Sequence, residues 1–300
     1  MSLNSNSALM NFFLKIKLPR LAWAIRKLHT PVNSTDLVLE VGSGGNPYPR
    51  SNILLDAYES TRERHWTPLV TDRPTILGFV ENLPFKDNTF DFVIASHVLE
   101  HSTDPAKFLS EIQRVGKAGY IEVPDAFMER INPYQDHRLE ITVRDGTLLI
   151  FKKDDWVQDR RVVELYEDRV KSYMTTELMP KRPFQFHVRY YWEGKIDFKI
   201  INDDVDASWA APKSDPRINH ISMLGRLKGL VYNGLAYILT QSKRNSDIEV
   251  LPLLSCLECG NGDLSRLTGS LTCNSCHAVF QVKGSLIDMK KRTNSASDLT

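Results

Sequence analysis

The chain has 300 residues, of which 42 % are hydrophobic and 25 % charged, as in an ordinary globular protein of about two domains. Its formal net charge of +1 gives no strong signal for a nucleic-acid partner. No apolar run approaches the roughly 18 residues of a membrane span. All four cysteines lie between Cys256 and Cys276, which leaves none for disulfides elsewhere and favours a cytoplasmic location.

Residues 1–35 contain five Lys or Arg and no acidic residue. Lys15, Lys17 and Arg20 interrupt the apolar stretch of this segment, which argues against a secretory signal. We expect a basic amphipathic helix that packs on the following domain. The alternative is a helix lying on a lipid surface, which would make the protein a peripheral membrane protein.

Five short apolar segments have the character of buried parallel strands. Between the last two, Asp104-Pro105 begins a helical pattern with one apolar face. Strands that alternate with crossover segments predict an α/β fold, with a doubly wound, mostly parallel sheet over residues 36–125. The five segments are Leu37–Val41, Ile53–Asp56, Thr75–Phe79, Phe90–Ser96 and Gly119–Val123.

The pattern changes after residue 125. Alternating segments flank an Asp145-Gly146 turn, which predicts a β-hairpin over residues 139–151. A helix-like stretch at 154–178 follows, and Glu193-Gly194 is expected to turn a further alternating segment back on itself. We expect residues 126–202 to form an antiparallel edge and lid that complete a domain at 36–202.

The remainder divides into three parts. Residues 203–249 are expected to form a linker and an amphipathic helix with an apolar stripe at 224–238, which either packs on the protein or lies at a membrane interface. A small unit of its own is expected at 250–290, and a disordered tail at 291–300.

The first predicted strand ends in a glycine-rich loop, Glu40-Val41-Gly42-Ser43-Gly44. Glycines let backbone N–H groups approach a ligand closely. The dinucleotide fingerprint needs a third glycine, where this chain has Pro47, and then a helix. Only Gly42–Asn52 separate the two strands, which leaves little more than one helical turn. The loop therefore disfavours a pyrophosphate ligand such as NAD.

Glu40-x-Gly42-x-Gly44 resembles the first motif of class I methyltransferases that depend on S-adenosyl-L-methionine (SAM). Asp56 matches the acid that holds the ribose hydroxyls in that family. Three further segments resemble its adenine-side segment, its fourth strand with the following loop as found in small-molecule methyltransferases, and its fifth strand. They are Gly78–Phe85, Phe90–His101 and Gly119–Pro124.

The resemblance implies a SAM site and places eight residues in it. Two positions depart from the family: Asn46 stands where a third glycine is frequent, and Phe79 where an acid often receives the adenine amino group. Adenine recognition would therefore rest on apolar packing and backbone groups. The implied cofactor-binding residues are Glu40, Gly42, Ser43, Gly44, Asp56, Val80, Glu81 and Ser96.

His97-x-x-Glu100-His101 matches the HxxEH zinc-protease pattern. That pattern needs a helix with both histidines, whereas here it directly leaves a predicted strand, so we predict no metal at this motif. Ser96, His97 and His101 either flank the cofactor and acceptor or are purely structural.

The acceptor pocket of the family is built after the fifth strand, where this chain has Asp136-His137-Arg138. His137 is the leading candidate for a catalytic base, and His101 is the second. The alternative is that this tripeptide is a solvated turn before the hairpin.

Cys256-x-x-Cys259 and Cys273-x-x-Cys276 form a four-thiolate zinc pattern. Four sulfur ligands leave no open position on the ion, so we expect a structural Zn²⁺; metal loss, or a redox role for one CxxC, is the alternative. Leu254–Met289 resembles the small zinc-ribbon activator of tRNA and release-factor methyltransferases. The resemblance implies a ribbon that stabilises a methyltransferase within the same chain.

The expected function is transfer of a methyl group from SAM to an oxygen, or another nucleophile, of a small molecule or glycan. One alternative is a tRNA or translation-factor acceptor, which only the ribbon suggests. The other is a SAM-binding module without activity. The sequence does not predict an oligomeric state.

Overall fold

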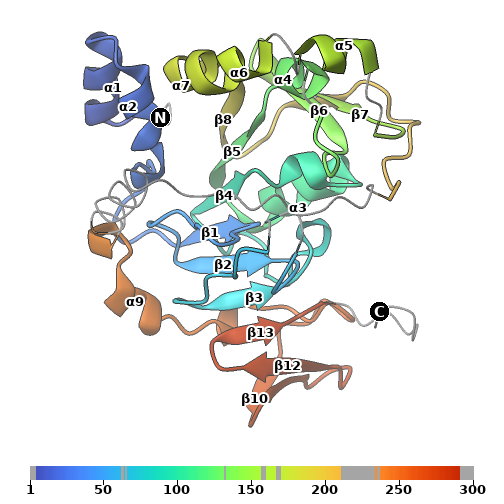
Figure 1. The fold of residues 1–300 in the computed structure, drawn as a ribbon. Helices are drawn as coiled ribbons and strands as arrows, with labels where there is room; N and C mark the ends of the chain where they lie inside the picture. The colour runs from blue at the N-terminus through green and yellow to red at the C-terminus, as the bar shows by residue number, and fades with distance from the viewer. Residues whose placement is uncertain are drawn as a thin grey trace.

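The computed structural model describes residues 5–61, 64, 66–131, 133–156, 160–166, 170–210, 234 and 237–290. Five parallel strands form its centre: β1 (Val38–Val41), β2 (Ile53–Asp56), β3 (Thr75–Leu77), β4 (Phe92–Ser96) and β5 (Ala118–Pro124). They lie in the order β3-β2-β1-β4-β5 (Figure 1). Each matches a predicted strand to within two residues at either end, and the α/β fold class is confirmed.

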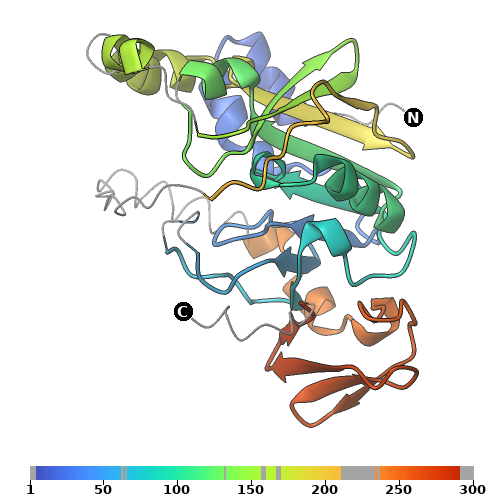
Figure 2. The same ribbon diagram turned by 90° about the vertical axis from the view of Figure 1, so that its right-hand side faces the viewer.

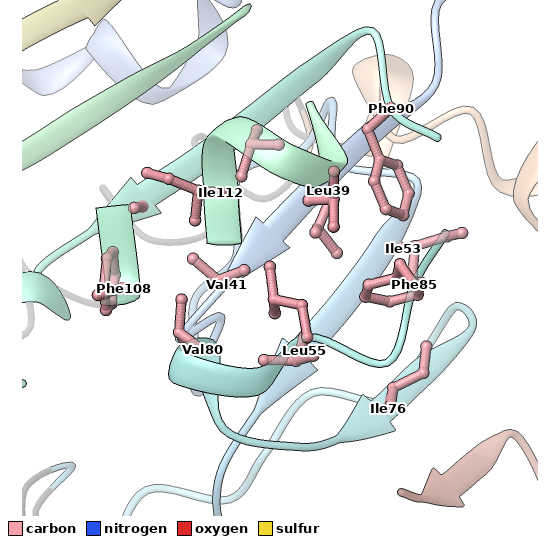
Figure 3. Packing of buried hydrophobic residues seen from close by; sticks show 14 of the residues in the cluster. Leu39, Val41, Ile53, Leu55, Ile76, Val80, Phe85, Phe90, Phe108 and Ile112 are labelled. Atoms are coloured by element: carbon pink, nitrogen blue, oxygen red, sulfur yellow. The ribbon is translucent and has the colours of Figure 1, made fainter. Parts of the chain in front are cut away.

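Helix α3 (Pro105–Val115) covers one face of this sheet. The Asp104 side chain accepts a hydrogen bond of 3.0 Å from a backbone N–H of the first turn and so caps the helix, as the sequence predicts. Figure 3 shows Phe108 and Ile112 of the helix on the same side of the sheet as Leu39 of β1. Burial of this apolar face against the sheet contributes to the main hydrophobic core of the domain.

No helix joins β1 to β2. The intervening chain turns back within Gly42–Asn52, as predicted, and carries Tyr48 to the other face of the sheet. There Tyr48 is buried against Phe92, and its ring lies 6.2 Å from that of Tyr120. A single aromatic side chain thus occupies space on the face that a crossover helix would cover.

An antiparallel strand completes one edge of the sheet, as expected. β8 (His187–Glu193) pairs with β5 along its whole length. A second, three-stranded sheet has the order β6-β7-β9. Its strands are β6 (Leu139–Arg144), β7 (Thr147–Lys152) and β9 (Phe198–Ile200).

We expected the segment after Glu193-Gly194 to turn back and pair with the segment before it, and this expectation is wrong. After one bridge between Glu193 and Lys195, the chain leaves β8, and β9 pairs in parallel with β7. The physical reason is the anchoring of Ile196, which is buried and donates its backbone N–H to the Gln113 side chain of α3 at 2.6 Å. This contact joins positions distant in sequence, so local alternation does not reveal it.

Short helical segments follow the strands, and four of them, α4 to α7, form the upper part of Figure 1. Met128, Tyr166, Met174 and Phe186 make a small core of their own there. The helical stretch predicted at 154–178 is present in the described residues and extends to Lys181. The segments are η3 (Val80–Asn82), η4 (Leu99–His101), α4 (Ala126–Ile131), α5 (Arg160–Leu165), α6 (Lys171–Tyr173), the π-helical η6 (Met174–Leu178), α7 (Met179–Lys181) and η7 (Pro183–Gln185).

The basic N-terminal segment forms two short helices and a 3₁₀ turn instead of one helix: α1 (Ala8–Lys15), α2 (Pro19–Ala24) and η1 (Arg26–Leu28). Pro19 begins the second helix, because proline is favoured in a first turn and is incompatible with a helix interior. The segment packs on the domain through Trp23, whose ring lies 5.2 Å from that of Phe184.

The C-terminal unit is a meander of four antiparallel strands. Its last strand pairs in parallel with β3, with Ile287 opposite Ile76, so the meander continues the main sheet into ten strands (Figure 2). α9 (Ser242–Ser246) and η8 (Leu251–Leu253) precede it. The strands are β10 (Leu264–Leu267), β11 (Ser270–Cys273), β12 (Val279–Lys283) and β13 (Leu286–Asp288).

Most of the predicted linker and amphipathic stripe, residues 211–233 and 235–236, lies outside the described residues, as does the tail at 291–300. Within the part of the chain that the structure describes, no helix has the length and apolar character that a membrane crossing requires.

Candidate functional site

Two cavities lie at the carboxyl ends of the parallel strands, where ligands bind in open α/β sheets. The glycine-side cavity has a volume of about 310 Å³ and is lined by Gly42, Asp56 and Phe79, among others. The histidine cavity, of about 350 Å³, lies beneath α4 and α7. His97 and His101 line both cavities, so the two adjoin.

A larger cavity of about 630 Å³ lies elsewhere, between the C-terminal meander and the chain before β3. It includes Arg73 and Pro74, which precede that strand, and Asn245 of α9. This is the amino-terminal side of the strands, and therefore not the edge where the chemistry of this fold class is found.

The glycine loop is tied directly to the acid at the end of β2. Gly42 and Gly44 have φ of +64° and +58°, which favours glycine at both positions. The Gly44 backbone N–H donates to Asp56 Oδ2 at 3.0 Å. A Cβ on Gly42 would lie 2.6 Å from a methyl carbon of Val98, so the loop is also packed against the segment after β4.

Glu40 lies behind this loop. Its carboxylate is buried and accepts hydrogen bonds from the Tyr48 backbone N–H at 2.7 Å and from the Ser51 hydroxyl at 2.6 Å. Burial raises the pKa of this group. Glu40 therefore stabilises the tight turn that stands in place of a crossover helix. Glu40 would affect a bound cofactor only indirectly, by holding the glycine loop in place.

The eight predicted cofactor-binding residues divide into two groups. Gly42, Asp56, Val80 and Glu81 line the glycine-side cavity. The other four lie at its back or beside it, without contributing to the described lining: Glu40, Ser43, Gly44 and Ser96. Four of the eight predicted residues thus line the cavity at this edge of the sheet, and the other four do not.

Arg64 contacts the acid that the resemblance assigns to the ribose. Its guanidinium donates to Asp56 Oδ1 at 2.6 Å, and also to the backbone oxygens of Tyr58 and Glu59 at 2.9 Å. Arg64 therefore occupies one oxygen of Asp56 and part of the cavity wall. Sequence analysis missed this residue, because a charged residue in a polar loop carries no signal of its partner.

Two aromatic side chains, Tyr58 and Phe79, line the glycine-side cavity, where the sequence predicts apolar contacts with an adenine. Phe79 is 40 % exposed, and its ring meets that of Tyr58 edge to face with centroids 6.0 Å apart. Glu81 accepts a hydrogen bond from the Ser102 hydroxyl at 2.5 Å. A carboxylate at the strand end, a glycine approach and exposed aromatic rings fit the sugar and base of SAM.

His97 stands between the two cavities, with a positive φ of 56°. Its Nε2 lies 3.3 Å from Glu122 and its Nδ1 3.4 Å from Glu100. Burial acts to lower the pKa of His97, but the two carboxylates outweigh it and raise the pKa to about 9. His97 is therefore an imidazolium at neutral pH and cannot serve as a base there.

The two histidines predicted as bases lie together in the histidine cavity, with ring centroids 4.7 Å apart. His101 Nδ1 is 3.0 Å from the backbone oxygen of Asp136, which can only accept, so Nδ1 carries the proton. His137 Nδ1 is 2.7 Å from the buried carboxylate of Glu129. In the neutral form each ring then has an unprotonated Nε2.

The alternative of a solvated turn around His137 is wrong, because this residue is only 8 % exposed. The Arg138 backbone N–H donates to the oxygen of Glu100 at 2.7 Å and draws the turn onto the segment after β4. Glu129, which orients His137, also accepts from Lys153 at 2.7 Å. Sequence reasoning missed Glu129 because it lies on a short helix with no motif.

The four cysteines come together as their spacing predicts. Cys256 and Cys276 have sulfurs 3.6 Å apart, as do Cys259 and Cys273, and the four sulfurs lie within 4.8 Å of one another. A tetrahedral site with Zn–S bonds of about 2.3 Å places its sulfurs about 3.8 Å apart. The cluster therefore fits a tetrahedral metal ion.

The chain resembles known methyltransferases in sequence. Residues 51–121 match the family model of a methyltransferase domain. An uncharacterized methyltransferase of Schizosaccharomyces pombe is 34 % identical over 107 residues, which are 29 % of this chain and 38 % of that protein. The chain thus spans well under half of that relative's length. The family model and this relative support a methyltransferase domain in this chain.

Two solved structures are more distant. One belongs to a complex containing the Haloferax volcanii Trm112 methyltransferase activator, with 17 % identity, a TM-score of 0.36, and coverage of 62 % of this chain and 93 % of the other. The other is a SAM-dependent methyltransferase of Archaeoglobus fulgidus, with 18 % identity, a TM-score of 0.30 and coverage of 46 % and 69 %. Structural similarity at TM-scores of 0.36 and 0.30 supports no conclusion about function.

Proposed function

We propose that this chain is a SAM-dependent methyltransferase whose acceptor is an oxygen, or another nucleophile, of a small molecule or glycan bound in the histidine cavity. One observation carries the proposal: Asp56 is hydrogen-bonded to the glycine turn beside a cavity that adjoins a second, histidine-lined cavity. A two-substrate transfer needs two such adjoining sites.

The glycine-side cavity would hold the cofactor. Asp56 would accept hydrogen bonds from the ribose hydroxyls, Phe79 and Tyr58 would pack on the adenine, and Gly42 would allow close approach of the chain. SAM supplies an electrophilic methyl group when bound.

Positioning of the acceptor would provide most of the rate enhancement. Orientation of two reactants can contribute roughly 7–11 kcal/mol to lowering a barrier. The Nε2 atoms of His101 and His137 would accept the proton of an acceptor hydroxyl. The cavity of about 350 Å³ is near the lower limit for small-molecule sites, which supports a small acceptor or a single sugar unit.

A structural Zn²⁺ held by the four cysteines is a further part of the proposal. The closed set of thiolates leaves no position for a substrate, so the ion would stabilise the meander and its pairing with β3. A tRNA or translation-factor acceptor is the second candidate, supported by the ribbon pattern of Leu254–Met289.

Calorimetry with S-adenosylhomocysteine tests the cofactor assignment. We expect binding to the zinc-loaded protein and at least ~10-fold weaker binding by Asp56→Ala, since each 1.4 kcal/mol lost is tenfold. Asp203→Ala is the matched control, because this acid is exposed and pairs with Lys152 away from both cavities. Absence of binding, or equal binding by the Asp56 variant, would exclude the assignment.

Labelled methyl transfer to fractionated cell extract tests the acceptor class. Protein incubated with methyl-tritiated SAM should label the small-molecule or glycan fraction. Labelling confined to RNA or protein would favour the second candidate, and an absence of transfer despite tight cofactor binding would favour a binding module.

A further inference from the structure

We infer that Glu100, His101 and His137 form a second metal site, for a divalent transition-metal ion, in the wall of the histidine cavity. One ligand atom from each of the three lies within 4.8 Å of the others. Two come from the turn η4 after β4, and the third from the loop before β6, so the tertiary fold brings them together.

Each of the two imidazoles has one ring nitrogen in a hydrogen bond, as metal-bound histidines do. His101 Nδ1 is committed to a backbone oxygen, and His137 Nδ1 to the Glu129 carboxylate. Histidine ligands almost always use one ring nitrogen for such an orienting hydrogen bond and the other for the metal. Each Nε2 is thereby left to bind an ion. Glu129 is itself fixed by Lys153 at 2.7 Å.

The third ligand, Glu100, has one cationic neighbour, His97, and no hydrogen-bond donor at either carboxylate oxygen among the described residues. Both of its carboxylate oxygens are buried, and neither accepts a hydrogen bond from any residue that the structure describes. The nearest cationic group is His97, at 3.4 Å, which is shared with Glu122. Buried carboxylates are ordinarily hydrogen-bonded, paired or bound to a metal. An ion held with the two imidazoles would give this carboxylate a direct bond in addition to its contact with His97.

The ligand set indicates the class of ion. Two imidazoles and one carboxylate suit Zn²⁺, Fe²⁺, Co²⁺ and similar ions, and leave coordination positions open. All three ligand residues line the histidine cavity, so an acceptor bound there would lie next to the ion. Under the proposed function, on which this step rests, the ion would bind the acceptor oxygen and lower the pKa of its hydroxyl. This activation would replace proton acceptance by the two Nε2 atoms, because the ion would occupy their lone pairs.

The site differs from the pattern seen in the sequence. In HxxEH the first ligand would be His97, but its backbone conformation places its Nε2 toward Glu122. His137 takes that place, from a segment 36 positions further along the chain than His101. The proposed site therefore combines Glu100 and His101 of the motif with His137, which lies outside it.

Co²⁺ titration of the full chain loaded with a single equivalent of Zn²⁺ tests the inference, because the four thiolates take up that one Zn²⁺ and leave the second site free for Co²⁺. We expect one further equivalent of Co²⁺, with visible d–d absorption but without a thiolate charge-transfer band. His101→Gln and His137→Gln should each weaken this binding at least ~10-fold. His187→Gln, which changes another histidine of the same cavity, should leave it unchanged.

No bound Co²⁺ in the zinc-loaded protein would overturn the inference, as would Co²⁺ binding that persists in both histidine variants. His101 is only half-buried, so its variant should fold even where changes at buried Glu100 do not. S-adenosylhomocysteine binding, measured on the same samples, separates the two proposals: its absence removes the methyltransferase assignment and leaves the metal site standing.

Discussion

The Arg26 guanidinium forms two hydrogen bonds, of 2.8 and 2.7 Å, with the two oxygens of the buried Glu122 carboxylate. This pair joins the N-terminal segment to β5. The Tyr120 hydroxyl donates to the same carboxylate at 2.5 Å, and His97 approaches it at 3.3 Å. Burial acts to raise the pKa of Glu122, but His97 and Arg26 outweigh burial and hold the pKa well below its usual value.

Arg26→Met should destabilise the protein by about 3–5 kcal/mol, because it leaves a buried carboxylate without its main cationic partner. Urea unfolding followed by circular dichroism would measure this loss. Arg20→Met is the matched control: Arg20 lies on the neighbouring helix α2 and is exposed, so its replacement should change stability by less than about 0.5 kcal/mol. Equal effects of the two variants would contradict a structural role for the pair.

The same pair predicts a pH dependence. Because the folded-state pKa of Glu122 lies below its unfolded value of about 4.5, its stabilisation is present above pH 4.5 and is lost as pH falls through the folded pKa. The stability difference between the wild type and Arg26→Met should therefore be large near pH 7 and shrink below about pH 4.5. A difference that is constant with pH would show that packing, rather than charge, carries the contact.

Arg64→Gln should tighten binding of S-adenosylhomocysteine by about 3–10-fold. Arg64 occupies Asp56 Oδ1 in the absence of ligand, so a ribose hydroxyl that uses this oxygen must displace it. Part of the binding free energy is then spent on breaking an ion pair. Calorimetry would measure the change, and Arg50→Gln, away from the cavity lining, is the control. Weaker binding by Arg64→Gln would show that this arginine contacts the ligand directly.

Zinc removal should destabilise the whole described domain and not the meander alone. β13 supplies the outer neighbour of β3, with three register pairs, so loss of the meander exposes an edge of the main sheet. Chelation or Cys256→Ser should lower the melting temperature of the core signal, and Zn²⁺ should restore it after chelation. Thr268→Ala, at an exposed turn of the meander, should have no such effect. An unchanged core transition would mean that the two parts unfold independently.

Local patterns predicted the features that depend on nearby residues. Buried strands such as Ile53–Asp56 are continuous apolar runs, and Asp145-Gly146 has the positive φ values of 50° and 77° that a tight hairpin turn requires. The resemblance placed Asp56 at the glycine turn because both lie at ends of adjacent strands. In each case the residues that determine the feature lie within one element or in two elements that follow each other in the sequence.

The rest depends on contacts between distant segments. The pairing of β13 with β3 joins residues more than 200 positions apart, and nothing in Leu286–Asp288 marks it as an edge of the main sheet. The contact between Arg64 and Asp56 arises in a polar loop without periodicity. The placement of His137 beside His101 follows from a backbone hydrogen bond of Arg138. Such contacts leave no signal in one sequence.

Glu129 should act as a positioning residue for His137. Its Oε2 lies 2.7 Å from His137 Nδ1, and Lys153 fixes the other oxygen at 2.7 Å. Glu129→Ala should weaken Co²⁺ binding to the zinc-loaded protein by about 10–100-fold, the range typical for loss of such an orienting partner. Glu129→Gln keeps a side-chain oxygen that can accept from Nδ1 and should recover part of the loss.

S-adenosylhomocysteine binding serves as the internal control, because Glu129 lines the histidine cavity but not the glycine-side cavity. Cofactor binding should therefore stay within about twofold of wild type in both Glu129 variants, since the two cavities meet only at other residues. Parallel loss of cofactor and cobalt binding would indicate that Glu129 supports the fold as a whole. Unchanged cobalt binding in Glu129→Ala would show that His137 is held by its packing against His101 and Tyr134 instead.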